Sequence, residues 1–184
     1  MKASSLKGEE GFRIDFVLDD LWTEAFFYHR WANLHLLEVC SKLPGEQMQL
    51  TSGGTYGTIA ATFLHLMAAE QRYLFRLTGA EAQIKESEGF PGIARLTELA
   101  ADSGARLIEA ARRTRPDDVI EANFQDGRFS LPLGIVLIQA LHHGNDHRTH
   151  ICTILGDHGI PYGDMDVWAY GDATGATVPL PASG

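Results

Sequence analysis

The stretch LGIVLIQALHHGNDHRTHICTIL at residues 133–155 decides the fold, because it combines helical periodicity with a dense set of histidines. Its apolar residues recur every three to four positions, which is typical of an amphipathic helix packed on a core. Pro132 suits the first turn of such a helix, and Gly156 suits its end. We therefore predict one long helix here, with histidines among its inward-facing residues.

Two of these histidines, His143 and His147, lie about 40° apart on one face of the helix and roughly 6 Å apart along its axis. Val136, Ala140 and Ile151 lie on or beside the same face, so the pair is expected to point into the core. Buried imidazoles without partners are costly, and a metal ion is one way to satisfy them. The pair therefore predicts a metal site inside the helical assembly.

The remaining histidines of this helix are less suited to the same ion. His142 points to another side of the helix. His150 shares the face, but it lies about 10.5 Å from His143 along the axis. With Zn–N bonds of about 2.1 Å, one ion cannot easily bind all three from a straight helix. The third ligand is therefore expected from a different helix.

His65 is our choice for this third ligand, because Ala61 and Ala69, one turn away on either side, are small and leave room for an ion. The rival is His29, which falls in line with Trp22 on the predicted apolar face of the first helix. A core-facing histidine that only forms hydrogen bonds is the simpler interpretation of either residue alone.

The rest of the chain is also mainly helical by its periodicity. Helices are predicted over 14–41, 56–78 and 93–113, in addition to the histidine-rich helix. An Asp-Gly turn within 123–129 predicts a short β-hairpin before that helix. Four amphipathic helices of about 20 residues predict an all-α fold, an antiparallel four-helix bundle, whose metal sites face inward.

Length and composition narrow the class of protein. The 184 residues are expected to form a single domain over 1–184, and a formal net charge of -9 argues against nucleic acid or membrane partners. Cys40 and Cys152 form no CxxC pair, so neither a disulfide framework nor a thiolate zinc site is indicated. Because no signal peptide or membrane-spanning stretch is evident, a cytoplasmic location is expected.

Several motifs together resemble those of the DinB/YfiT-like superfamily of metalloenzymes. HGNDHR at 143–148 looks like its HxxxHR motif in the last helix, and FLHLMAAE at 63–70 looks like its segment in the second helix. YHRWAN at 28–33 is similar to the helix-one pattern, and Gly159 to Asp166 is similar to the tail after the last helix. The resemblance covers nearly the whole chain and implies a four-helix bundle with three metal-ligating histidines.

By this resemblance the metal ligands are His65, His143 and His147, the same three that helix geometry favours. The chain departs from the family pattern at Thr149-His150, where Gly-Gln is usual, so His150 is expected to line the site or to face substrate. The resemblance also implies a homodimer, for which an exposed Trp31 would mark the interface.

Three histidine ligands leave a coordination position open, which is typical of a catalytic site. The metal is expected to be Zn²⁺, Ni²⁺, Fe²⁺ or Mn²⁺, because all four accept imidazole. The resemblance favours transfer of a low-molecular-weight thiol, since characterised relatives include thiol transferases and a thiol-dependent isomerase. A metal-dependent hydrolase and a non-catalytic, stress-related metal- or ligand-binding protein are the alternatives.

No protein nucleophile or catalytic side chain is indicated by the sequence. Glu70 faces away from His65 and is interpreted as a paired or capping carboxylate. Arg72 and Arg76 lie on the His65 face of the same helix, where they would meet an anionic substrate. Ordinary solvent-exposed arginines are the alternative interpretation.

Overall fold

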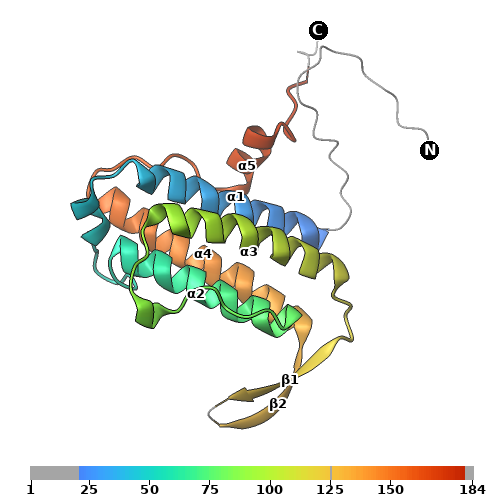
Figure 1. Ribbon diagram of the computed structural model, residues 1–184. Helices are drawn as coiled ribbons and strands as arrows, with labels where there is room; N and C mark the ends of the chain where they lie inside the picture. The colour runs from blue at the N-terminus through green and yellow to red at the C-terminus, as the bar shows by residue number, and fades with distance from the viewer. Residues whose placement is uncertain (1–20, 125, 181–184) are drawn as a thin grey trace.

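The computed structural model describes residues 21–180 apart from Gln125 (Figure 1). The long helices are α1 (Leu21–Ser41), α2 (Ile59–Thr78), α3 (Ile93–Arg113) and α4 (Leu133–Asp157). Shorter elements are the 3₁₀ helices η1 (Gly45–Gln49) and η2 (Glu86–Glu88), the strands β1 (Val119–Phe124) and β2 (Gly127–Pro132), and helix α5 (Val167–Thr174). Predicted helical residues 14–20, Leu18 among them, lie outside the described residues.

The four long helices pack side by side around the core (Figure 1). Helix α1 packs on α3 and α4, and α2 packs on α3 and α4. Fully buried side chains from all four helices, such as Phe26, Phe63, Leu96 and Ile151, fill the space between them. The chain is therefore mostly helical, as the periodicity predicted.

The ends of α2 show how local sequence sets a helix boundary. The side chain of Thr58 accepts a hydrogen bond from the backbone N–H of Ala61 at 3.1 Å, so the helix begins at Ile59 rather than at 56. At the other end, Gly79 adopts a left-handed conformation with φ of 74°, and the helix ends at Thr78, where the predicted range 56–78 also ends.

The predicted hairpin is present as the antiparallel pair of β1 and β2, with Phe124 opposite Gly127 and Val119 opposite Pro132. It projects from the helical body, between α3 and α4 in the chain (Figure 1). Pro132 thus ends a strand and precedes α4, whereas the sequence placed it in the first helical turn.

The buried face of α1 contains His29, as the sequence predicted, but not Trp22. His29, Phe26 and Leu36 are almost fully buried, whereas Trp22 is 43% exposed. Trp22 is the second residue of the helix, next to the exposed Leu21. The face of α1 that carries His29 is therefore buried, whereas the N-terminal end of the helix at Trp22 is not.

Helix α5 was not predicted, because the sequence after Gly159 reads as a Gly- and Pro-rich tail. The Asp166 side chain caps it by accepting from the Ala169 N–H at 2.8 Å. Its Tyr170 ring lies 5.7 Å from the Trp31 ring, so Trp31 is half-buried rather than exposed. The reason we gave for placing Trp31 at a dimer interface was therefore wrong, and the homodimer stays a prediction.

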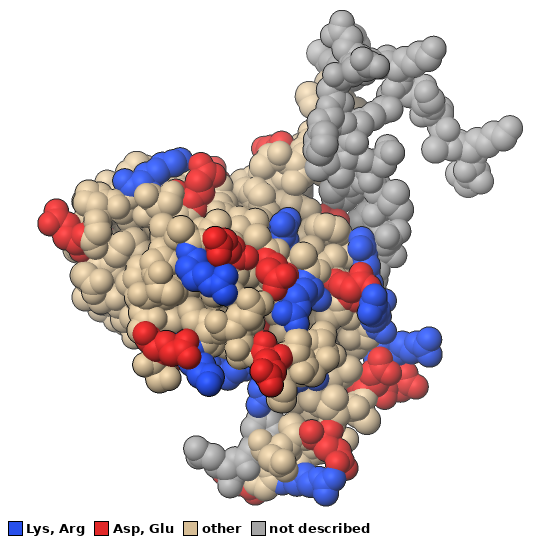
Figure 2. Space-filling model, viewed as in Figure 1, with Lys and Arg blue, Asp and Glu red and all other residues tan. Residues whose placement is uncertain are grey.

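Acidic and basic side chains alternate over the face shown in Figure 2. On α3 they form the pairs Arg95–Glu98 and Arg106–Asp102. Exposed ion pairs of this kind contribute little to the free energy of unfolding, so burial of the core contributes more to it. Within the described residues, no helix is long and apolar enough to cross a bilayer.

A buried polar cluster links the four long helices, and we call it the Glu70 network. Glu70 of α2 lies 2.8 Å from His29 Nε2 and accepts a hydrogen bond from Asn33 at 3.2 Å, both of α1. It also accepts from Ser103 Oγ of α3, and Arg148 of α4 donates to Asn33 Oδ1 at 2.8 Å. Each of these side chains is at most 4% exposed, so the network joins the helices from inside.

Opposing effects act on the carboxyl group of Glu70. Burial opposes its ionisation, but hydrogen bonds with His29 and Ser103 and the charge of Arg148 outweigh burial and hold the pKa of Glu70 below its ordinary value. Close approach also matters here, because a Cβ at Gly144 would overlap with the His29 ring. Glycine at this position lets α4 come near enough for the network to form.

Replacing Glu70 with Gln is expected to lower the free energy of unfolding by about 3 kcal/mol at pH 7, because one partner of a buried pair is lost. Since the folded-state pKa of Glu70 is lowered, its stabilisation is full above about pH 4.5 and is lost as pH falls through the folded-state pKa. Urea unfolding at pH 7 and pH 3.5 should show the variant deficit shrinking with acid. Glu98→Gln, on the surface, should change little, and a deficit independent of pH would contradict the assignment.

Candidate metal centre

Three histidine side chains converge between α2 and α4. His65 comes from α2 and His143 and His147 come from α4, and one ring nitrogen from each lies within 4.8 Å of the others. The Nε2 atoms of His65 and His143 are 3.1 Å apart. Two nitrogens that each lie about 2.1 Å from one ion are separated by roughly 3.0–3.4 Å for angles of about 90–110°. The spacing therefore fits ligands that share one ion.

The chemical state of these rings also suits a cation. Burial, together with the neighbouring His147 and His65, lowers the pKa of His143 to about 4. Burial, with His65 and His150 nearby, likewise lowers the pKa of His147 to about 4. Both are neutral at pH 7, which is the form that binds metal. Their Nδ1 atoms are buried and have no hydrogen-bond partner among the described residues, so the cluster fits a divalent ion.

The carboxylate of Glu86 contacts the Nδ1 side of the His65 ring, whereas the Nε2 side faces His143. Glu86 Oε2 in η2 lies 3.0 Å from His65 Nδ1, and because an ionised carboxylate only accepts, Nδ1 donates. This tautomer directs the Nε2 lone pair of His65 toward His143. Partial burial opposes ionisation of Glu86, but hydrogen bonds with His65 and Arg72 outweigh it and keep the pKa of Glu86 below its ordinary value.

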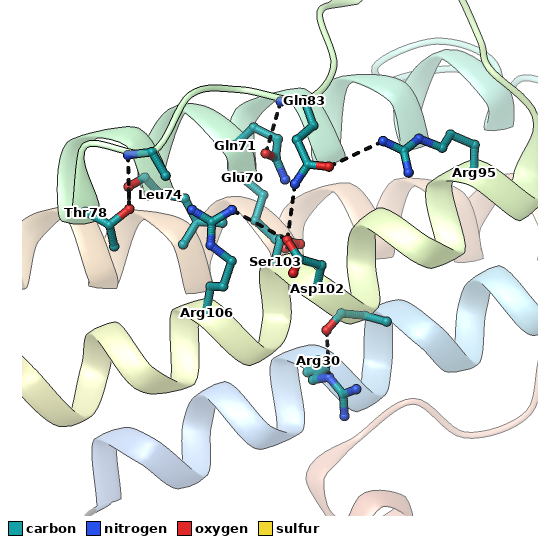
Figure 3. Close-up of polar contacts among 12 residues, drawn as sticks. Arg30, Glu70, Gln71, Leu74, Thr78, Gln83, Arg95, Asp102, Ser103 and Arg106 are labelled. Atoms are coloured by element: carbon teal, nitrogen blue, oxygen red, sulfur yellow. Dashed lines mark hydrogen bonds and ion pairs between the residues drawn. The ribbon is translucent and has the colours of Figure 1, made fainter.

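The segment that carries Glu86 is anchored by Gln83, as Figure 3 shows. The Gln83 backbone N–H donates to Gln71 Oε1 at 3.3 Å, and its side-chain amide donates to Asp102 at 3.2 Å. Arg95 donates to Gln83 Oε1 at 3.4 Å. These contacts hold the segment that carries Glu86 against α2 and α3.

Aromatic rings flank the histidines. Tyr56, 48% exposed, stacks on His65 with ring centroids 4.1 Å apart and donates to Glu86 at 3.4 Å. It also meets His147 edge-on at 5.1 Å, while Tyr73 lies 5.7 Å from His143. Burial, followed by the charge of Glu86, raises the pKa of Tyr56, so its phenol keeps its proton at neutral pH. The rings of Tyr56 and Tyr73 therefore border the histidine cluster.

The other histidines considered from the sequence lie elsewhere. His29 belongs to the Glu70 network, and His142 is exposed beside Asp146 at 3.1 Å. The His150 ring lies 5.2 Å from the His147 ring, but His150 is not part of the converging trio. The structure thus brings together the predicted trio, and metal binding by it stays a prediction.

Sequence reasoning missed Glu86 and Tyr56 in this centre. Glu86 lies in the polar segment between α2 and α3, where no periodicity distinguishes it from Glu88. Tyr56 was assigned to the start of the second helix but lies in the loop before it. What the sequence offered for Glu86 and Tyr56 was their position close to the ends of the helix that carries His65.

Comparison with known proteins agrees with this geometry. The sequence model of the DinB superfamily matches residues 28–151, which include all three histidines and end before α5. The fold is similar to that of a DinB-like protein from Bacillus cereus, with a TM-score of 0.60 and 16% identity over 78% of this chain and 94% of that chain. At this identity the likeness shows the fold alone. No curated protein matches the chain.

Replacing His143 with Ala is expected to abolish stoichiometric binding of a divalent ion, because two ring nitrogens cannot replace three. Elemental analysis of protein purified without a histidine tag measures this directly. The matched control is His142→Ala, one residue away on the outside of α4, which should keep a full equivalent. Retention in His143→Ala, together with loss in His29→Ala or His150→Ala, would overturn the assignment of ligands.

Replacing Glu86 with Gln is expected to weaken metal binding by about 10–100-fold, because a neutral amide fixes the His65 tautomer less firmly and makes the ring a weaker donor. Competition with a chromogenic chelator measures the dissociation constant. Glu88→Gln, in the same turn of η2, is the control and should bind as wild type does. Equal affinities of the two variants would mean that Glu86 does not support the ligand.

Proposed function

The chain belongs to the DinB superfamily, and from this premise we propose that it is a metal-dependent enzyme that transfers a small thiol to an electrophile. In this proposal the four long helices form an antiparallel four-helix bundle that holds the ion through His65, His143 and His147. The observation that carries the proposal is the convergence of three imidazoles, two of them neutral at pH 7 by their lowered pKa values.

The donor set supports a reactive centre more than a closed structural one. Three imidazoles leave at least one coordination position for a small molecule. A divalent ion bound there supplies positive charge that favours the thiolate form of a thiol. Glu86 keeps the His65 tautomer that presents Nε2, and the rings of Tyr56 and Tyr73 border the cluster. The nitrogen donors are compatible with Zn²⁺, Ni²⁺, Fe²⁺ and Mn²⁺.

The nucleophile in this proposal comes from a small molecule, because the protein's own thiols are unsuited to the task. Burial raises the pKa of Cys40 to about 12 and that of Cys152 to about 11. Both therefore stay protonated at neutral pH, and a thiol is a poor nucleophile compared with its thiolate. Neither cysteine belongs to the converging trio.

The metal-loaded protein is expected to accelerate substitution of a chromogenic aryl halide by a thiol, in which the carbon–sulfur bond forms, the carbon–halogen bond breaks, and halide and the thiol proton are released. A panel of bacillithiol, mycothiol, glutathione and coenzyme A would find the preferred thiol. His147→Ala should lower the rate by roughly 100-fold or more, since a metal ion contributes several kcal/mol to the transition state. His142→Ala is the control on the same helix.

Equal rates for wild type and His147→Ala would contradict a catalytic metal and favour the non-catalytic binding protein. Metal-dependent cleavage of an activated ester without any thiol would instead identify a hydrolase. Both outcomes would overturn thiol transfer as the function.

A further inference from the structure

A groove of about 860 Å³ lies beside the metal centre, between the C-terminal half of α2, the segment that follows it and strand β1. Three cationic side chains line it, namely Arg72, Arg76 and Lys85. Phe75, which is 55% exposed, adds an apolar surface to the wall. The residues that line the groove include none of the three histidines.

The charge of the groove is opposite to that of the chain. The whole protein carries a formal net charge of -9, whereas the groove gathers three cations with two acidic residues, Glu81 and Glu121. Glu121 is paired across the hairpin with Arg128, and Arg72 is paired with Glu86, both partners lying outside the lining. The cations Arg76 and Lys85 then outnumber the acidic residue Glu81. A concave surface with this balance attracts anions and concentrates them locally.

The groove and the metal centre share one ion pair. Arg72 lines the groove and donates to Glu86 Oε1 at 3.0 Å, while Glu86 Oε2 contacts His65. Arg72 and Arg76 lie seven and eleven residues after His65, on the same face of α2. At 1.5 Å per residue they are about 10 Å and about 16 Å from His65 along the helix axis. Arg72 therefore belongs both to the lining of the groove and to the ion pair that supports the metal centre.

We propose that this groove binds the anionic end of the substrate while the thiol end reaches the metal centre. The inference rests on the proposed function and specifies its substrate class. The substrate is an elongated thiol with a carboxylate or phosphate group roughly 10–16 Å from its sulfur atom, the span set by the helical spacing. Thiols without a distant anionic group contact the centre but not the groove.

Anion binding is tested first on metal-free protein, so that the result does not depend on thiol transfer. Succinate and inorganic phosphate serve as carboxylate and phosphate probes, and succinamide is the neutral counterpart of succinate. The groove variant combines Arg76→Gln with Lys85→Gln. The control variant combines Arg113→Gln with Lys42→Gln, two exposed cations outside the groove that remove the same charge.

Calorimetric titration of wild type should show binding of succinate, phosphate or both, and no binding of succinamide. The groove variant should bind the anion at least tenfold more weakly, and the control variant should match wild type. Equal weakening in both variants would reduce the effect to overall charge and overturn the inference. Binding of succinamide as tight as that of succinate, or no binding of either anion, would overturn it as well.

A second measurement compares kcat/KM for coenzyme A, whose phosphate groups are separated from its sulfur atom by the long pantetheine arm, with kcat/KM for the neutral 2-mercaptoethanol. The ratio should fall about tenfold in the groove variant and stay constant in the control. A constant ratio in both variants would refute the groove as a substrate subsite while thiol transfer stands. Absence of turnover with every thiol would refute the proposed function. The titration of metal-free protein would then still decide whether the groove binds anions.

Discussion

The buried carboxylate of Glu70 is the constraint on which the arrangement of the helices depends. An ionised group in the core is tolerated only where hydrogen bonds and opposite charge replace its lost hydration. Its partners come from every other long helix: His29 and Asn33 from α1, Ser103 from α3, and Arg148, through Asn33 and His29, from α4. Hydrophobic contacts alone permit helices to slide or rotate by small amounts, but this network is complete at one register only.

That register also brings the metal ligands together. Glu70 follows His65 by five residues on α2, and Arg148 is next to His147 on α4. When Glu70 is held near Arg148, α2 and α4 are held in one position relative to each other. His65 on α2 is thereby held near His143 and His147 on α4. Gly144, one residue after His143, allows the close approach of α4 to His29 that the network needs. The network is made of protein side chains, which hold α2 and α4, the two helices that carry the three histidines, in one arrangement.

The sequence could predict those parts of the fold and site that depend on spacing within one helix. The pairing of His143 with His147 follows from helical geometry, and His65 was selected by its small neighbours. Trp22 was placed wrongly because periodicity predicts the face on which a residue lies but not how far along the helix the core extends, and Trp22 lies next to the exposed first residue Leu21. Glu86 could not be predicted, since its position depends on Gln83 contacts with two helices distant in sequence. Helix α5 is only eight residues long, and its cap at Asp166 was hidden in a Gly- and Pro-rich stretch.

Two carboxylates with lowered pKa values have different roles: Glu70 stabilises the packing of the helices, and Glu86 contacts His65 in the candidate metal centre. Glu70 is 2% exposed and is satisfied by side chains that face the core, so its charge stabilises the packing of the helices. Glu86 lies at the edge, with a side chain 38% exposed, and its two oxygens connect a metal ligand to Arg72. A solute that competes for Arg72 would therefore change the hydrogen bonding of Glu86, and through Glu86 the donor strength of His65, without disturbing the Glu70 network. Under the proposed function, binding at the groove and reactivity at the histidines are coupled through Glu86, which contacts both Arg72 and His65, while the Glu70 network stabilises the fold.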